Sequence, residues 1–177
     1  MRPVGGGNGA GNGSGGGGGM RRDAPVERDA SGLEVLSHDE CIALLRQGVV
    51  GRVVFTAAAL PAVLPVNYVV DADGSVLLRT GAQTRLATAA GDVVAFETDD
   101  VGRPGSTDTA WSVVVTGRLT IVRDPAERAR VDALGLRSWV PSARDLLMRI
   151  APELVSGRRL PAAGSYAPVD QAGQQAG

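Results

Sequence analysis

The feature that most constrains the fold is a series of short runs rich in β-branched residues, joined mostly by turn signals without a helix between them. The runs cover residues 49–56, 61–70, 75–80, 93–98, 110–122, 146–150 and 154–160. Gly117 interrupts the longest run, where we expect a bulge or bend. A doubly wound parallel sheet needs a helix between successive strands, and that alternation is missing. The sequence therefore predicts a mainly β, α+β fold: an antiparallel barrel of about seven strands with short peripheral helices.

Three short helices are expected around these strands. Ser37 and Glu40 have the spacing of a capping box, and the helix that they begin should stop at Gly48. A second helix is predicted over 84–90. A third should begin after Asp124, with Pro125 in its first turn, and run to about Leu134.

The two ends of the chain differ from its middle in composition. Eleven of the first 19 residues are Gly, and such a segment has little apolar surface to offset the entropy of ordering. We expect residues 1–32 to be a disordered Gly-rich tail, 33–160 to be the folded domain and 161–177 to be a disordered C-terminal tail. Met20 is an alternative to Met1 as the first translated residue.

Composition excludes several classes of chemistry. The formal net charge is −1, which removes the electrostatic basis for binding nucleic acid or an anionic membrane. All 18 basic residues are Arg, so a Schiff-base or P-loop lysine is excluded. One Cys and one His cannot build a disulfide framework or a zinc centre, and we expect no metal site. No apolar run reaches the roughly 18 residues of a membrane span, so we expect a cytoplasmic protein.

Several residues with reactive or aromatic side chains have plainer interpretations. His38 should be an exposed residue at the start of a helix, and Cys41 a small buried hydrophobe on the same helix. The acidic stretch 97–100 is expected to form a solvated loop, with a metal site as the alternative. Trp111 and Trp139 are either core residues or planar walls for a ring-shaped ligand.

The segment from Arg79 to Arg85 is the strongest candidate for a binding site. A strand ends in Arg79-Thr80, a Gly turn follows, and a helix begins at Thr84-Arg85. Hydroxyls, guanidinium groups and the N–H groups of a helix start would suit a phosphate dianion. An exposed polar turn is the alternative, and spacing alone does not choose between them.

Seven pieces of sequence, in their order along the chain, resemble the pyridoxamine 5′-phosphate oxidase-like, flavin-binding split-barrel superfamily, especially its small actinobacterial-type members. The pieces are Gly51-Arg52-Val53; Leu64-Pro65-Val66-Asn67-Tyr68-Val69-Val70; Leu78-Arg79-Thr80 with Arg85; Val94-Ala95-Phe96-Glu97; Trp111-Ser112-Val113-Val114-Val115-Thr116-Gly117-Arg118; Trp139-Val140-Pro141; and Arg149-Ile150-Ala151-Pro152 with Gly157-Arg158-Arg159. They span nearly all of 37–160.

This resemblance implies a split barrel that forms a homodimer, with FMN in a cleft between the subunits. It implies that the backbone of Pro65, Val66, Asn67 and Tyr68 passes along the flavin ring, and that Ser112 next to Trp111 faces the cofactor. It also implies a phosphate cradle, made of Arg79, Thr80, Thr84 and Arg85. Relatives often have Lys near Arg85, and Arg keeps the charge. The substrate-binding C-terminal Trp and Arg/His cluster of true pyridoxamine-phosphate oxidases is not matched; Arg158 and Arg159 are the nearest candidates.

The leading functional hypothesis is a flavin-dependent oxidoreductase that acts on a small molecule, because the cofactor would carry the chemistry without a catalytic His, Cys or Lys. No catalytic residue is assigned. The deazaflavin F420 on the same fold is an alternative, with Arg52 or Arg118 as extra contacts. Further alternatives are a non-catalytic flavin- or haem-binding module and a barrel that only dimerises. Haem ranks below flavin because His38 is poorly placed as an axial ligand.

Overall fold

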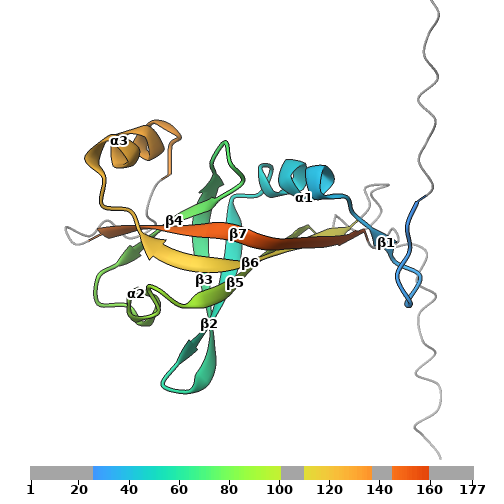
Figure 1. Cartoon of the computed structure of the whole chain (residues 1–177), viewed down its shortest axis with the longest axis horizontal. Coiled ribbons are helices and arrows are strands. Elements are labelled where there is room, and N and C mark those ends of the chain that lie inside the picture. The colour runs from blue at the N-terminus through green and yellow to red at the C-terminus, as the bar shows by residue number, and fades with distance from the viewer. Residues whose placement is uncertain (1–25, 101–109, 137–144, 160–177) are drawn as a thin grey trace, which may run out of the picture.

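The computed structural model describes residues 26–100, 110–136 and 145–159 of the 177-residue chain (Figure 1). Its elements, in chain order, are β1 (Glu34–Val35), α1 (His38–Leu45), β2 (Val50–Ala57), β3 (Leu60–Val70), β4 (Val76–Gly81), α2 (Arg85–Thr88), β5 (Val93–Asp100), β6 (Trp111–Ile121), α3 (Pro125–Ala133) and β7 (Asp145–Arg159).

The strands form one sheet that closes on itself. Its order is β1-β7-β4-β3-β2-β5-β6, and β6 also pairs with β7, so six strands make a closed barrel. All of these strand pairings are antiparallel. β1 is a short addition that pairs with the far end of β7. The predicted antiparallel barrel with short peripheral helices is therefore confirmed.

The last two predicted strands are a single element, which corrects the sequence prediction. We expected a break at Ala151-Pro152-Glu153, yet β7 runs unbroken for 15 residues. Pro152, which has no N–H to donate, lies at a β-bulge: Thr116 pairs with Leu154 while Gly117 pairs with Pro152, so Glu153 is the extra residue. The bulge predicted at Gly117 is confirmed. A Cβ at this position would lie 1.7 Å from the carbonyl oxygen of Ala151, so only Gly allows the two strands to pair there.

The main core fills the barrel and continues beneath α1. Inward-facing residues alternate along the strands, as Val53 and Phe55 do on β2, and the ring of Phe96 meets Tyr68 edge-on at 4.7 Å between centroids. Cys41 and Leu45 attach α1 to this core. The Ser37–Glu40 capping box is present.

A second, smaller core lies beneath α3. Its buried members are Leu77, Val122, Val131, Leu136 and Leu147. Asp124 begins α3 as predicted, because its side chain accepts the N–H of Ala126. β4 and β7 therefore contribute side chains to both cores, with alternate residues facing opposite sides.

The end of the predicted N-terminal tail makes contacts with the barrel. Within 26–32, the side chain of Asp29 accepts the Nε–H of Arg158 at 2.7 Å. The N–H of Val35 donates to Glu27, and Arg28 forms a β-bridge with Glu34. These seven residues thus belong to the described fold, while the rest of both predicted tails lies outside the described residues.

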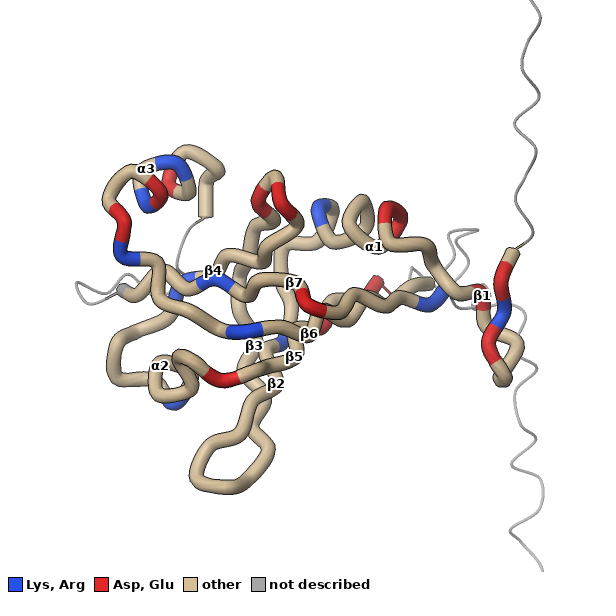
Figure 2. Tube along the Cα trace, viewed as in Figure 1, with Lys and Arg blue, Asp and Glu red and all other residues tan. Residues whose placement is uncertain are grey.

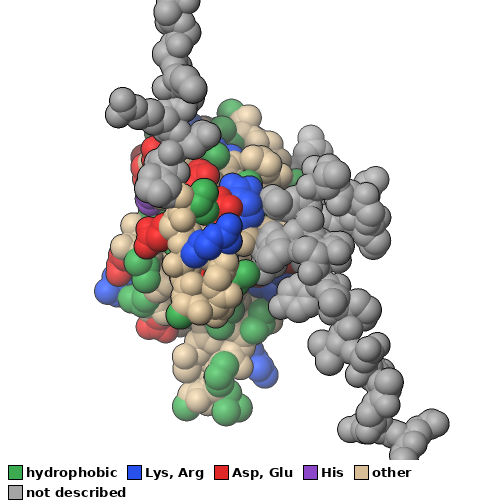
Figure 3. Space-filling model, turned by 90° about the vertical axis from the view of Figure 1, so that its right-hand side faces the viewer, with side chains coloured by type: hydrophobic (Ala, Val, Ile, Leu, Met, Phe, Trp, Pro, Cys, Tyr) green, Lys and Arg blue, Asp and Glu red, His purple; other side chains and the backbone are tan. Residues whose placement is uncertain are grey.

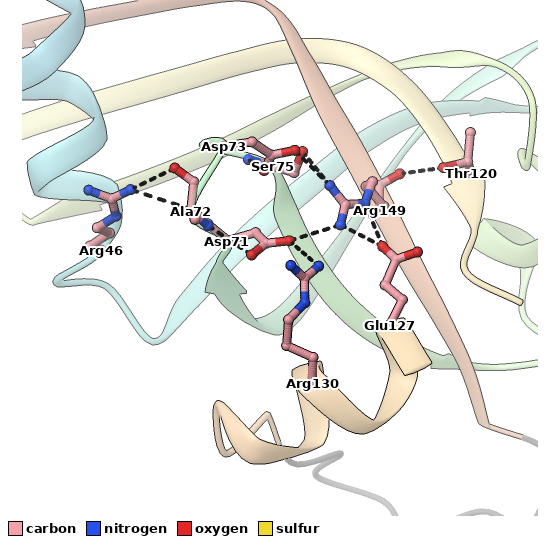
Figure 4. Close-up of polar contacts among 9 residues, drawn as sticks. All are labelled: Arg46, Asp71, Ala72, Asp73, Ser75, Thr120, Glu127, Arg130 and Arg149. Carbon is pink, nitrogen blue, oxygen red and sulfur yellow. Dashed lines mark hydrogen bonds and ion pairs between the residues drawn. The ribbon is translucent and has the colours of Figure 1, made fainter. Parts of the chain in front are cut away.

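An ionic cluster ties α3 to the β3–β4 turn and to β7 (Figure 4). Arg149 on β7 bonds Asp71 and Asp73 of the turn, each at 2.9 Å, and Glu127 of α3 at 2.5 Å. Arg130 of α3 makes a second bond to Asp71 at 2.9 Å. Asp71 is nearly buried, and Arg149 mostly so. The cluster connects three elements that are distant in sequence, so we expect it to set the position of α3 against the sheet.

Substitution of Gly117 tests the close approach at the bulge. We expect Gly117→Ala to lower the free energy of unfolding by at least about 2 kcal/mol, because the new Cβ would displace the β7 backbone. Gly81→Ala is the control, since its Cβ would make only an ordinary contact of 3.6 Å with Thr84. Urea unfolding curves measure both, and equal losses would contradict the prediction.

Removal of Arg149 tests the ionic cluster. We expect Arg149→Met to lower the free energy of unfolding by about 1.5–3 kcal/mol near neutral pH. Asp71 keeps its bond to Arg130, but Asp73 and Glu127 lose their bonds to Arg149. Urea unfolding of the variant and the wild type at one pH measures this loss. A cost below about 1 kcal/mol would contradict it.

The same variant should change the pH dependence of stability. Burial raises the pKa of Asp73, but bonds from the backbone and side chain of Ser75 and the charge of Arg149 outweigh it, so this pKa lies below its usual value. A lowered pKa adds stability above about pH 4, and that stability is lost as the pH falls through the folded-state value. Unfolding curves between pH 3 and 7 should therefore show the difference between wild type and Arg149→Met narrowing in acid. A constant difference would contradict this assignment.

Candidate cofactor site

The barrel opens between β3 and β4. Their ladder has three pairs, from Val70–Val76 to Tyr68–Leu78. Beyond that level β3 continues to pair with β2 as far as Leu60, and β4 with β7 as far as Gly81. The two strands diverge just where a continued register would set Val66 opposite Thr80. Residues 65–67 of β3 and the end of β4 are therefore not joined by ladder bonds, and the side chains of Val66 and Thr80 are buried there.

Two threonines lie at the β4 side of this opening. Thr80 is only 6% exposed, and its hydroxyl lies 2.8 Å from that of Thr84. Thr84 donates to the carbonyl of Gly81 at 2.9 Å and accepts the N–H of Ala87, which caps α2. The hydroxyl pair thus holds the turn in shape. It would have to rotate before it could donate to a bound anion.

Arg85 follows at the first position of α2 and is exposed. The helix is shorter than the predicted 84–90, ending at Thr88. Leu86 anchors it in the core, so the turn and Arg85 are held near the end of β4. Arg85 is the cation of the predicted cradle that remains accessible there.

Arg79 is not brought together with Thr80 and Thr84. Because alternate residues of a strand face opposite sides, Arg79 shares its face with Leu77, beneath α3. Its side chain is 14% exposed and forms an ion pair with Asp132 of α3. In this structure Arg79 holds α3 against β4.

The four residues of the β3 motif differ in what they present. Pro65 is exposed, Val66 is buried and Asn67 is half-buried. The Tyr68 side chain points into the core, where its hydroxyl donates to the carbonyl of Leu45 at 2.8 Å, and burial raises its pKa. Tyr68 can therefore contribute only its backbone to a site at the split.

Trp111 and Ser112 lie far from Thr80 along the sheet. Thr80 pairs with Leu146 near the start of β7, whereas Trp111 pairs with Arg159 at its end. Trp111 is 8% exposed and belongs to the main core. Ser112 is half-buried on the outer face of the sheet, between Asp99 and Arg158. Within one chain these residues do not join the Thr80 site, and Trp139 lies outside the described residues.

The acidic stretch 97–100 is part of β5, which corrects the predicted loop. Glu97 and Asp99 point to the same side because they are two residues apart on a strand, and both bond Arg52 of β2, at 2.9 and 2.6 Å. The hydrogen bonds that Arg52 donates to the carboxylates of Asp99 and Glu97 raise its pKa. The alternation of side chains along a strand could have indicated from the sequence that Glu97 and Asp99 share one face of the sheet. The cross-strand register that brings Arg52 to them is not visible in the sequence.

Other arginines considered for ligand binding are engaged within the chain. Arg118 donates to the carbonyl of Gly91 at 2.5 Å. Arg158 bonds Asp29, and Arg159 bonds Glu34. His38 is exposed and Cys41 fully buried, as predicted; burial, followed by the charge of Glu40, raises the pKa of the Cys41 thiol. Among the described residues, no group of three or more His, Cys, Asp or Glu could hold a metal.

Comparison with known proteins decides the family. A family model described as pyridoxamine 5′-phosphate oxidase matches residues 37–159. The chain belongs to this family. The pyridoxamine 5′-phosphate oxidase model covers all six barrel strands, the β3–β4 split and the turn before α2, and it leaves out only β1 among the strands.

Relatives of this oxidase family extend the likeness. The uncharacterized protein Rv0080 of Mycobacterium tuberculosis is 44% identical over 148 residues, which cover 80% of this chain and 93% of that protein. An FAD-binding protein of Mycobacterium smegmatis has a solved structure with 35% identity and a TM-score of 0.63, covering 72% of this chain and 98% of the other. An FAD- and haem-binding protein of the same organism, 16% identical with a TM-score of 0.55, covers 80% and 92% and shares the fold. No helix in the described part of this family member is long and apolar enough to cross a membrane.

Proposed function

We propose that this protein binds a flavin, FMN, in a site shared by two subunits, and serves as a flavin-dependent oxidoreductase on a small molecule. The observation that carries the proposal is the short β3–β4 ladder, with the Thr80–Thr84 turn and Arg85 directly after the end of β4, in a chain of the pyridoxamine 5′-phosphate oxidase family. The flavin-binding relative with 35% identity supports the class of cofactor.

The groups at the split fit the parts of FMN. The exposed guanidinium of Arg85 can pair with a phosphate dianion. Ala82 and Gln83 of the preceding turn are also exposed, whereas the Thr84 N–H already donates to the carbonyl of Gly81. On the β4 side of β3, where the ladder has ended, the C=O of Pro65 and the backbone of Asn67 can bond the polar edge of a flavin ring. Pro65 has no N–H to donate. FMN has one phosphate group, which suits a site with one accessible arginine. FAD, which the Mycobacterium smegmatis relative binds, is the second candidate.

A bound flavin would supply the hydride or electron transfer, while the protein binds and orients it. Arg85 would neutralise the phosphate, and the β3 edge would fix the ring against the barrel. The described residues offer no alternative centre: Cys41 is buried with a raised pKa, and His38 is exposed at a helix start. The burial of Cys41 and the exposed position of His38 also argue against either residue as an axial haem ligand.

Engagement of Arg52 and Arg118 weakens the argument for F420. Arg52 is held by Glu97 and Asp99, and Arg118 by a backbone carbonyl. Both would have to break bonds to hold a longer anionic tail. FMN requires neither, so we favour it.

A second subunit would bring Ser112 to the cofactor. The outer sheet face carries exposed apolar side chains from β2, β3, β5 and β7, and we call it the open sheet face; its members are Val50, Val54, Val63, Val93 and Leu154. Apolar patches of this kind on a soluble domain typically mark an interface. Ser112 shares this face, so a partner docked there would carry its own Ser112 toward the neighbouring subunit.

Loss of Arg85 tests the phosphate site. We expect Arg85→Ala to weaken FMN binding about ten- to a hundredfold, because a charge-assisted contact is worth roughly 1.5–3 kcal/mol. Arg123→Ala, which removes an exposed arginine between β6 and α3, should leave the affinity unchanged. Fluorescence quenching measures the affinity of each variant for FMN, FAD and riboflavin. Because riboflavin has no phosphate, Arg85→Ala should weaken riboflavin binding less than FMN binding. Equal FMN affinities of the two variants would contradict the phosphate site.

The shared site predicts a dimer. Size-exclusion chromatography with light scattering should give twice the 18.1 kDa chain mass when flavin is bound. A monomer that binds flavin would contradict the shared site. Anaerobic bleaching of the flavin absorption by NADH or NADPH would support an enzyme over a carrier.

A further inference from the structure

The β2–β3 hairpin projects from the barrel, away from α1 and α3 (Figure 1). Its strands pair up to Ala57 and Leu60, so the connection is only Ala58-Ala59. Both residues have positive φ, 50° and 62°. Two-residue hairpin turns with this geometry prefer Asn-Gly, because a Cβ is strained there. The tip therefore keeps a strained turn without the polar residues that would relieve it.

The hairpin is also uncharged and apolar. No charged residue occurs from Val53 to Val70, and the projecting loop carries no charge along its trace (Figure 2). Leu60 is 69% exposed and Val63 is 60% exposed. Hydrophobic side chains gather on this projection (Figure 3). Exposed hairpin tips usually carry Gly, Asn or Asp, so this tip has the chemistry of a surface that becomes covered.

The hairpin is continuous with the open sheet face. Val54 and Val63 pair across β2 and β3 and both point outward, and Val54 is also opposite Ala95 of β5. The arginines on this face are engaged within the chain: Arg52 by Glu97 and Asp99, and Arg118, opposite Val93, by the carbonyl of Gly91. A partner for this surface must therefore be largely apolar and need bring no compensating charge. A second copy of the same face meets that requirement.

We propose that the hairpin tip, residues 57–60, packs against a second copy of this chain and is a principal anchor of the homodimer. The inference rests on the dimer in the proposed function and adds the segment that holds it. In a twofold dimer both partners use the same surface, so each tip, lying beyond the centre of the face, reaches over the other subunit. Burial of Leu60 and the Ala58-Ala59 methyl groups in that contact would offset the strain of the turn.

A charge at the tip tests this interface. Leu60→Asp should raise the dimer dissociation constant at least tenfold in sedimentation velocity runs over a dilution series. The control is Leu134→Asp, since Leu134 is 48% exposed at the end of α3, on the other side of the barrel from the hairpin. It should leave the constant unchanged. Equal constants for both variants and the wild type would overturn the proposal.

A second variant separates loss of contact from loss of the hairpin. Replacing Ala58-Ala59 by Asn-Gly favours the same turn, so the hairpin should form more readily, yet it removes apolar surface at the tip. We expect a dissociation constant at least threefold higher than that of the wild type. An unchanged constant would overturn the proposal. So would wild-type binding to phosphatidylcholine vesicles that Leu60→Asp abolishes while the dimer persists.

These outcomes are distinguishable from a failure of the proposed function. A wild-type dimer that binds FMN, with hairpin variants of unchanged dissociation constant, contradicts the hairpin contact alone. A wild-type monomer at every concentration contradicts both the shared site and the hairpin contact. FMN titration and sedimentation of the same wild-type sample separate the two cases.

Discussion

The pairing of β6 with β7 closes the barrel, and the other elements take their positions from it. β7 is long enough to pair with β6 along its length, with β4 at its start and with β1 at its end. The pairing survives Pro152 because the bulge displaces one residue and Gly117 leaves room for the backbone of Ala151. If the strand broke there, as the sequence suggested, β6 would become an unpaired edge and the main core would open to water.

The β6–β7 pairing closes the barrel, whereas β3 and β4 diverge after a short ladder. β4 follows β7 as far as Gly81 while β3 follows β2, so their shared ladder is short and the split results. The turn before α2 sits at this opening, held by the Thr80–Thr84 pair. The candidate site therefore results from strand pairing, in which β3 continues with β2 and β4 continues with β7.

The sequence indicated part of this site. The Thr80–Arg85 segment and the β3 motif could be found because both are contiguous, and the resemblance to the family attached a role to them. The role of Arg79 could not be judged from spacing. It lies next to Thr80 in the chain, but strand alternation turns it toward Asp132 and α3. The Arg52–Glu97–Asp99 and Arg149 clusters were invisible because each joins residues from strands or helices far apart in sequence.

The sequence by itself determined the local elements: the capping box at Ser37, the cap at Asp124 and the strand runs. Each depends on side chains within a few residues of one another, so composition and period suffice. The tertiary structure decided the continuity of β7, the split between β3 and β4, and which arginines remain accessible. These depend on register between distant strands, where shifting the pairing by a single residue would turn every side chain to the opposite face.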